Sequence, residues 1–255
     1  MLGSDPVDTF RDLEGKLQKL KLEIGGGIGG GISERRKILE MKRIIGALGN
    51  LDDERAVETL VGLLDVDDEF NDEYYDVFFS AINALAVLGN ERAVEPLVGL
   101  LDGAEDQVIG RVIKALGRIG DERAVEELES LSGRFVPWNL RIIALENLAF
   151  LGNKKAFEDL ISIMGERESR TLKDVAPVLG RLGDQRAVEP LISIIPADCR
   201  GYNYVRYAVT ALGKLGGEMS IEALIAVLHD ETVTWMVRED VIRILENQGG
   251  EGAVD

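Results

Sequence analysis

Six glutamates occupy the same place in a phrase that recurs along the chain. Four residues after each of them stands a glycine, serine or alanine, so a helix would carry both on one face, one turn apart. Carboxylates beside small side chains would form an acidic trough for a basic segment or a helix of a partner protein. The six glutamates are Glu58, Glu95, Glu126, Glu158, Glu189 and Glu222.

A basic residue stands three positions before five of these glutamates, and it offers a second interpretation. A ladder of ion pairs between neighbouring repeats would neutralise the carboxylates and serve solubility alone. The small residues would then only let helices approach closely. The sequence leaves both interpretations open. The basic residues are Arg55, Arg92, Arg123, Lys155 and Arg186.

The segment 65–76 is strongly acidic and places oxygen-bearing side chains at the liganding positions of a calcium loop. However, Phe70 stands where such a loop needs glycine, and the last position is Asp76 instead of glutamate. We therefore expect a solvated acidic loop and leave cation binding open. If the loop binds a partner, Tyr74 and Tyr75 supply aromatic anchors beside the charge.

A second aromatic segment runs from Cys199 to Tyr207 and contains three tyrosines and two arginines. Tyr202 and Tyr204, next to such arginines, could bind a peptide or an anion. Arg206 also has a structural explanation, since an arginine recurs near the start of several of the predicted helices.

The sequence gives little support for a catalytic site or a metal site. His229 is the single histidine and Cys199 the single cysteine, too few for a zinc site or a triad with a histidine base. We expect no catalytic residue, metal or cofactor. The net charge of −17 disfavours nucleic acid as a partner. Without a signal peptide, a membrane-spanning run or a disulfide pair, the expected location is the cytoplasm.

The candidate groups lie in a repeated unit of the form Glu-Arg-Ala-Val-Glu-x-Leu, preceded by an amphipathic helical stretch that ends at glycine. Each unit predicts a helix A, a glycine stop and a capped helix B. The chain is thus expected to be all-α, with six helical hairpins, a final single helix and essentially no sheet. The small residues of the phrase, at separations of 37, 31, 32, 31 and 33, are Ala56, Ala93, Ala124, Ala156, Ala187 and Ser220. The predicted caps of the B helices are Asp53, Asn90, Asp121, Asn153, Asp184 and Gly217.

Three segments are predicted: an N-terminal helix in residues 1–23, a Gly-rich linker in 24–32, and the repeats in 33–255. The first helix would either cover the open first end of the stack or dock onto a partner. The linker contains GxGxxG, but the helical segment before it argues against a phosphate loop, which follows a strand.

The pattern Ala-Leu-Gly-x-Leu/Ile-Gly-Asp-x-Arg-Ala-Val-Glu-Pro-Leu resembles the PBS (phycobilisome) lyase subtype of the HEAT repeat, over roughly residues 33–255. The resemblance implies a right-handed α-α superhelix, or solenoid, whose B helices line a concave face. The family includes scaffolds, adaptors, bilin lyase subunits and a di-iron hydroxylase marked by His-Glu pairs, which this chain lacks. We therefore expect a non-enzymatic scaffold, adaptor or assembly factor that binds a protein on its concave acidic face. The alternative is a phycobilin-lyase-like subunit that holds a chromophore or protein substrate.

Overall fold

The computed structural model describes residues 6–25, 32–51, 53–65, 72–133, 135–165, 169–195 and 202–251. These residues are helical or lie in short turns, and none of them forms a strand, which confirms the predicted all-α class. Along the described residues the helices follow one another as six A–B pairs and a final single helix, the order that the repeat pattern predicted. The chain divides into two compact units, Met1–Asn147 and Leu148–Asp255.

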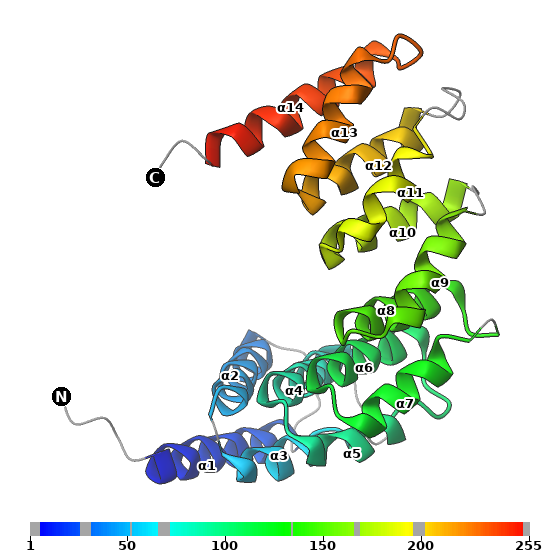
Figure 1. Cartoon of the computed structure of the whole chain (residues 1–255). Helices are drawn as coiled ribbons and strands as arrows, with labels where there is room; N and C mark the ends of the chain where they lie inside the picture. Colours follow the sequence, from blue (N-terminus) through cyan, green and yellow to red (C-terminus); the bar gives the residue numbers. More distant parts are fainter. Residues whose placement is uncertain are drawn as a thin grey trace. The chain divides into compact units, whose positions relative to one another are not determined.

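The first unit contains the initial helix α1 (Pro6–Gly25) and the first hairpins (Figure 1). Its A helices α2 (Ile32–Gly49), α4 (Asp72–Leu88) and α6 (Asp106–Ile119) pack one against the next. The B helices α3 (Glu54–Val61), α5 (Val94–Gly99) and α7 (Glu122–Leu131) form the second layer, and the boundary between the units falls within α8 (Trp138–Phe150). Neighbouring hairpins therefore share one core.

The second unit continues the same alternation of helices. Its A helices α10 (Ser169–Leu182), α12 (Tyr202–Leu215) and α14 (Trp235–Glu251) pack in sequence. The B helices are α9 (Lys154–Gly165), α11 (Val188–Ile192) and α13 (Gly217–His229). No helix in the described part of either unit is long and apolar enough to cross a membrane.

Leucines of both layers meet in the core, and their burial supplies the main favourable term of folding. Leu60, Leu97 and Leu128 of the B helices have no exposed surface, and neither have Leu85 and Leu116 of the A helices. Each contributes about 1.5–3 kcal/mol at most. Because these contacts join consecutive hairpins, a hairpin is stabilised by its neighbours.

The helix boundaries follow the predicted signals. The five glycines expected to stop the A helices have φ between 59° and 85°, the left-handed region that glycine enters without steric cost. They are Gly89, Gly120, Gly152, Gly183 and Gly216.

The predicted caps are confirmed for five of the six B helices. The side chains of Asp53, Asn90, Asp121, Asn153 and Asp184 each accept a hydrogen bond from a backbone N–H of the following turn. The sixth prediction is wrong. Gly217 is the first residue of α13, and Gly216 precedes it without a side-chain cap, because two consecutive glycines bring no acceptor.

Prolines reshape the start of two B helices. Pro96 and Pro190 have no N–H to bond the carbonyl four residues earlier, so the first turn tightens into a 3₁₀ helix. These turns are Glu91–Ala93 before α5 and Gln185–Ala187 before α11.

Helix α1 packs against α2 and buries Phe10 and Leu17, which are 4 % and 1 % exposed. The guanidinium of Arg55 lies 4.4 Å from the centre of the Phe10 ring. Arg186 lies in the same way over Phe157 of α9, the preceding B helix. Since Phe10 takes the place that Phe157 takes in α9, α1 covers the first hairpin as a B helix would. These contacts favour the end-capping interpretation over a free docking helix.

Small residues allow neighbouring A helices to pack closely against each other. A Cβ added at Gly49 would lie 2.8 Å from the Cβ and 2.9 Å from the Cα of Ala84, on the next A helix. A Cβ at Gly180 would lie 3.0 Å from the Cα of Ala211. Larger side chains here would push neighbouring repeats apart.

The effect of this close approach can be tested with one substitution at two places on α2. Gly49→Ala should lower the free energy of unfolding by about 1–3 kcal/mol, because the added methyl meets the backbone of Ala84. Gly46→Ala should raise it by up to about 1 kcal/mol, since nothing lies within 4 Å of the new Cβ and alanine favours the helix. Urea unfolding followed by circular dichroism measures both; equal effects would contradict the packing argument.

Candidate protein-binding surface

The six recurring glutamates are exposed, and they lie at matching positions of successive B helices. In the first unit they are Glu58, Glu95 and Glu126. In the second unit they are Glu158, Glu189 and Glu222. We call each set of three a glutamate row. The small residues four positions later are exposed as well, as a trough requires: Gly62, Gly99, Ser130, Ser162, Ser193 and Ala226.

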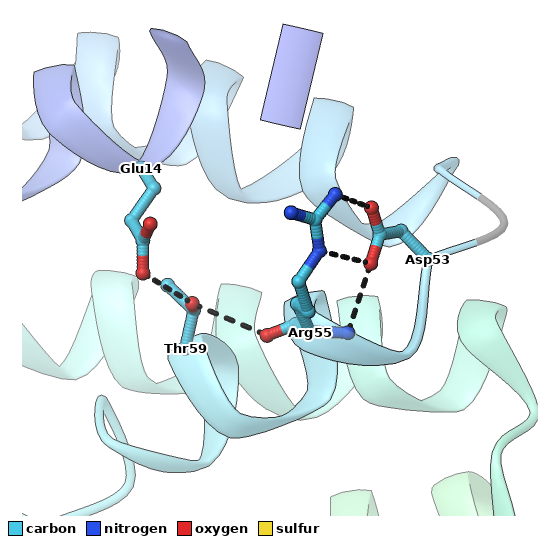
Figure 2. Close-up of polar contacts among 4 residues, drawn as sticks. All are labelled: Glu14, Asp53, Arg55 and Thr59. Atoms are coloured by element: carbon cyan, nitrogen blue, oxygen red, sulfur yellow. Dashed lines mark hydrogen bonds and ion pairs between the residues drawn. The ribbon is translucent and has the colours of Figure 1, made fainter. Parts of the chain in front are cut away.

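The arginines three residues before the glutamates turn mainly to the capping aspartates. The Nη2 atom of Arg55 lies 2.6 Å from Asp53 Oδ2, and its Nε donates to Asp53 Oδ1 over 2.9 Å. Figure 2 shows this fork together with the backbone N–H of Arg55, which donates to the same carboxylate. Asp184 and Arg186 repeat the arrangement, again at 2.6 Å.

This hydrogen bonding stabilises the charged form of the capping residue. Side-chain hydrogen bonds from Arg186 hold the pKa of Asp184 below its ordinary value, and Arg55 does the same for the pKa of Asp53. The same guanidinium groups stack on Phe157 and Phe10, which restricts their movement further. These arginines thus hydrogen-bond to the capping aspartates, although the charge of Glu158, on the preceding B helix, also stabilises the charged form of Arg186.

Two arginines do form ion pairs between neighbouring repeats. Arg123 Nη1 lies 3.6 Å from a carboxylate oxygen of Glu95, and Arg92 Nη1 lies 3.1 Å from Glu54. Of these two acids, only Glu95 belongs to a glutamate row. In the described part of the chain, the other five row glutamates have no ion pair within 4 Å. The proposed ladder therefore exists at one row position, and most of the row charge remains open to solvent.

A groove of about 530 Å³ lies where the first row begins, between α1 and α3. Glu58 and Gly62 form part of its wall, and Glu14 and Lys21 of α1 face them. Glu14 accepts a hydrogen bond from the Thr59 hydroxyl, as Figure 2 shows, and Lys21 Nζ donates to the Gly62 carbonyl over 3.2 Å. At this end of the row α1 already contacts the position that a partner would occupy.

The predicted aromatic anchors are only partly described. Tyr75 is 42 % exposed and packs against Phe78 and Phe79, with ring centres 6.4 and 5.9 Å away. The side chains of Tyr74, Tyr202 and Tyr204 lie outside the described residues, as does the acidic segment 66–71.

One contact beside Tyr75 escaped the sequence analysis. The Arg111 guanidinium lies 4.1 Å from the centre of the Phe79 ring, and its Nε is buried without a hydrogen-bond partner. The sequence could have indicated this contact, because Phe79 and Arg111 are 32 positions apart, which is the length of one repeat.

No group of three or more His, Cys, Asp or Glu side chains suited to a metal ion occurs among the residues with described placement.

Comparison with known families identifies the repeats. Residues 69–134 match the model of HEAT repeats, and residues 205–230 match that of the PBS lyase HEAT-like repeat. This confirms the subtype predicted from the repeated phrase. A search of the curated proteins found no match to the chain.

Three solved structures show similarity at low identity. Human deoxyhypusine hydroxylase in complex with glycerol is 21 % identical, with a TM-score of 0.38, over 94 % of this chain and 96 % of that one. The complex of CpcE and CpcF of phycocyanin lyase from a Nostoc species is 20 % identical, with a TM-score of 0.43, over 89 % and 92 %. A designed armadillo repeat protein in complex with peptide (KR)4 is 17 % identical, with a TM-score of 0.34, over 92 % and 98 %. No activity is transferred from similarity at this level.

The Asp184–Arg186 pair predicts a pH-dependent loss of stability. Asp184→Ala removes a helix cap and should cost about 1 kcal/mol at pH 7. The pKa of Asp184 is lower in the folded protein than in the unfolded chain. The ionised carboxylate therefore contributes fully to the free energy of unfolding above the ordinary carboxyl pKa near 4, and this contribution is lost as the pH falls through the lower folded-state pKa.

Urea unfolding at pH 7 and at pH 3 measures the free energy of unfolding of Asp184→Ala and of the original protein. The difference between the two proteins should be smaller at pH 3. Asp102→Ala, in the exposed turn between α5 and α6, is the control and should change stability by less than about 0.5 kcal/mol. A loss of equal size at both pH values would contradict the assignment.

Proposed function

We propose that this chain, which carries HEAT repeats of the PBS lyase type, is a scaffold that binds a basic segment of a partner protein along its glutamate rows. The observation that supports this most directly is that five of the six row glutamates are exposed and lack an ion pair within the described structure. Arg55 and Arg186, which precede two of these glutamates, are held by capping aspartates and aromatic rings instead. The rows thus present negative charge at regular intervals.

The spacing of the rows constrains the bound segment. Helices packed side by side lie about 8–10 Å apart, so the glutamates of neighbouring B helices should recur at that interval. A polyproline II segment presents every third side chain on the same face, about 9 Å apart. A partner segment with Lys or Arg at every third residue would therefore match three consecutive B helices within one unit.

The small residues next to the glutamates support the same arrangement. Gly99 and Ser130 in the first unit project little or no side chain beyond the helix surface, whereas Lys21 of α1 already contacts Gly62. A peptide backbone can therefore approach the helices while its basic side chains reach the carboxylates. Long-range attraction from the net charge of −17 would also speed its association.

The glutamate rows can be tested with a labelled peptide that carries Lys at every third residue and Ser elsewhere. Fluorescence anisotropy should show binding that weakens with salt, and weaker binding of a peptide with the same composition but clustered Lys. The double variant Glu58→Lys, Glu126→Lys should bind about tenfold more weakly, since it reverses two exposed charges worth up to about 1 kcal/mol each.

The matched control is Asp102→Lys, Glu105→Lys, which makes the same charge change in the exposed turn between α5 and α6. Its affinity should stay within about twofold of the original protein at physiological salt, where Debye screening acts over about 8 Å. Undiminished binding by the row variant, or equal weakening by the control, would refute the glutamate-row mechanism.

A lyase-like subunit is the second candidate, and the match of residues 205–230 to the PBS lyase HEAT-like repeat is the observation in its favour. Such a subunit would hold a bilin or the protein that receives it. If so, mixing the chain with phycocyanobilin should shift the bilin absorbance and raise its fluorescence. A spectrum identical to that of the pigment alone, with and without phycocyanin apoprotein, would remove this candidate.

A further inference from the structure

A cleft of about 260 Å³ lies between the A helices α10 and α12 of the second unit. It is separate from the glutamate rows, which belong to the B helices. The cleft is lined by Pro177, Arg206, Tyr207, Thr210, Ala211 and Lys214.

The charge around this cleft is opposite to that of the whole chain. Helix α12 carries Arg206 and Lys214 and no acidic residue. On α10, Lys173 and Arg181 are exposed four residues before and after Pro177, on the same helix face. Neither these two cations nor Asp174, the one acid of α10, lines the cleft, and both Arg181 and Asp174 have interactions of their own. The two helices thus form a basic surface on a protein of net charge −17.

Several polar groups of the cleft have no partner in the described structure. These are the hydroxyls of Tyr207 and Thr210 and the ammonium of Lys214. They are donors, and their neighbours Pro177 and Ala211 offer only apolar surface. The cleft therefore joins an apolar wall to hydrogen-bond donors and positive charge.

Arg206 is oriented by a buried carboxylate. Its Nε lies 3.3 Å from Asp240 Oδ2, whose side chain is only 9 % exposed and which also pairs with Arg243 at 3.1 Å. Asp240 of α14 lies one repeat after Ala208 of α12, and both are buried. The Asp240 carboxylate thus occupies the position that the Ala208 methyl group has in the preceding repeat, and it orients the Arg206 guanidinium. The Arg206 side chain nevertheless remains 51 % exposed.

The dimensions indicate what could bind. Arg206 and Lys214 are eight residues apart on one helix, or about 12 Å along its axis. A single small anion such as phosphate does not span that distance, whereas two acidic side chains about four residues apart on an extended peptide do. The apolar wall suits the methylene stem of a glutamate, and the volume is smaller than that of most small-molecule pockets.

We propose that the α10–α12 cleft binds an acidic segment of a partner protein, with one carboxylate at Arg206 and a second at Lys214. Tyr207 and Thr210 donate hydrogen bonds between them, and the stem of a bound glutamate packs on Pro177 and Ala211. The segment from Cys199 to Tyr207, singled out by its tyrosines and arginines, contributes Arg206 and Tyr207 to this site.

The test uses the full chain and a labelled peptide with two Glu residues four positions apart, followed by fluorescence anisotropy. Lys214→Glu should weaken binding at least tenfold. Lys114→Glu, an exposed lysine of A helix α6 in the first unit, makes the same charge change away from the cleft and should change affinity less than twofold. Circular dichroism confirms that both variants fold.

Two further probes identify the ligand class. The same peptide with Gln in place of Glu should bind at least tenfold more weakly, and inorganic phosphate should displace the Glu peptide only at far higher concentration. Equal binding of the Gln peptide, displacement by phosphate at the concentration of the peptide, or unchanged affinity of Lys214→Glu would overturn the proposal. Lys214→Glu should not alter binding of the Lys peptide to the glutamate rows, which separates this result from that of the proposed scaffold function.

Discussion

The structure depends on one constraint: a helical hairpin of about thirty residues can bury its apolar face only against neighbouring hairpins. The leucines of both layers are fully buried because each lies between helices of the same and the adjacent repeat. Small residues where A helices meet, such as Gly49 against Ala84, allow the backbones to approach. Helix α1 satisfies the same constraint at the start of the stack by placing Phe10 beneath Arg55.

This packing decides which charges remain available. The short step from a glycine stop to a capped helix puts Asp53 and Asp184 two residues before an arginine, at hydrogen-bond distance. Each such pair satisfies a helix end and holds a guanidinium. The glutamate one turn later is then left exposed. Helix capping, a local requirement of the fold, thereby leaves carboxylates open along the B helices.

The A helices α10 and α12 differ in charge from the exposed rows of the B helices, and the proposals for binding follow from that difference. The B helices present glutamates at matching positions, whereas α10 and α12 present lysine and arginine around a cleft. Because exposed charges are screened within about 8 Å at physiological salt, these surfaces can act separately on one chain. A scaffold with two such surfaces could hold a basic and an acidic segment at the same time.

The sequence alone determined the helical class, the number of hairpins, the glycine stops and most caps, because local periodicity and backbone conformation specify them. It also placed the glutamates on one helix face, since four residues make about one turn. It did not determine that Arg55 bonds Asp53, that Arg111 stacks on Phe79 or that Asp240 orients Arg206. It singled out the segment from Cys199 to Tyr207, but not the α10–α12 cleft that Arg206 and Tyr207 line. Those contacts depend on where side chains of different helices meet in space, and only the tertiary packing sets those distances.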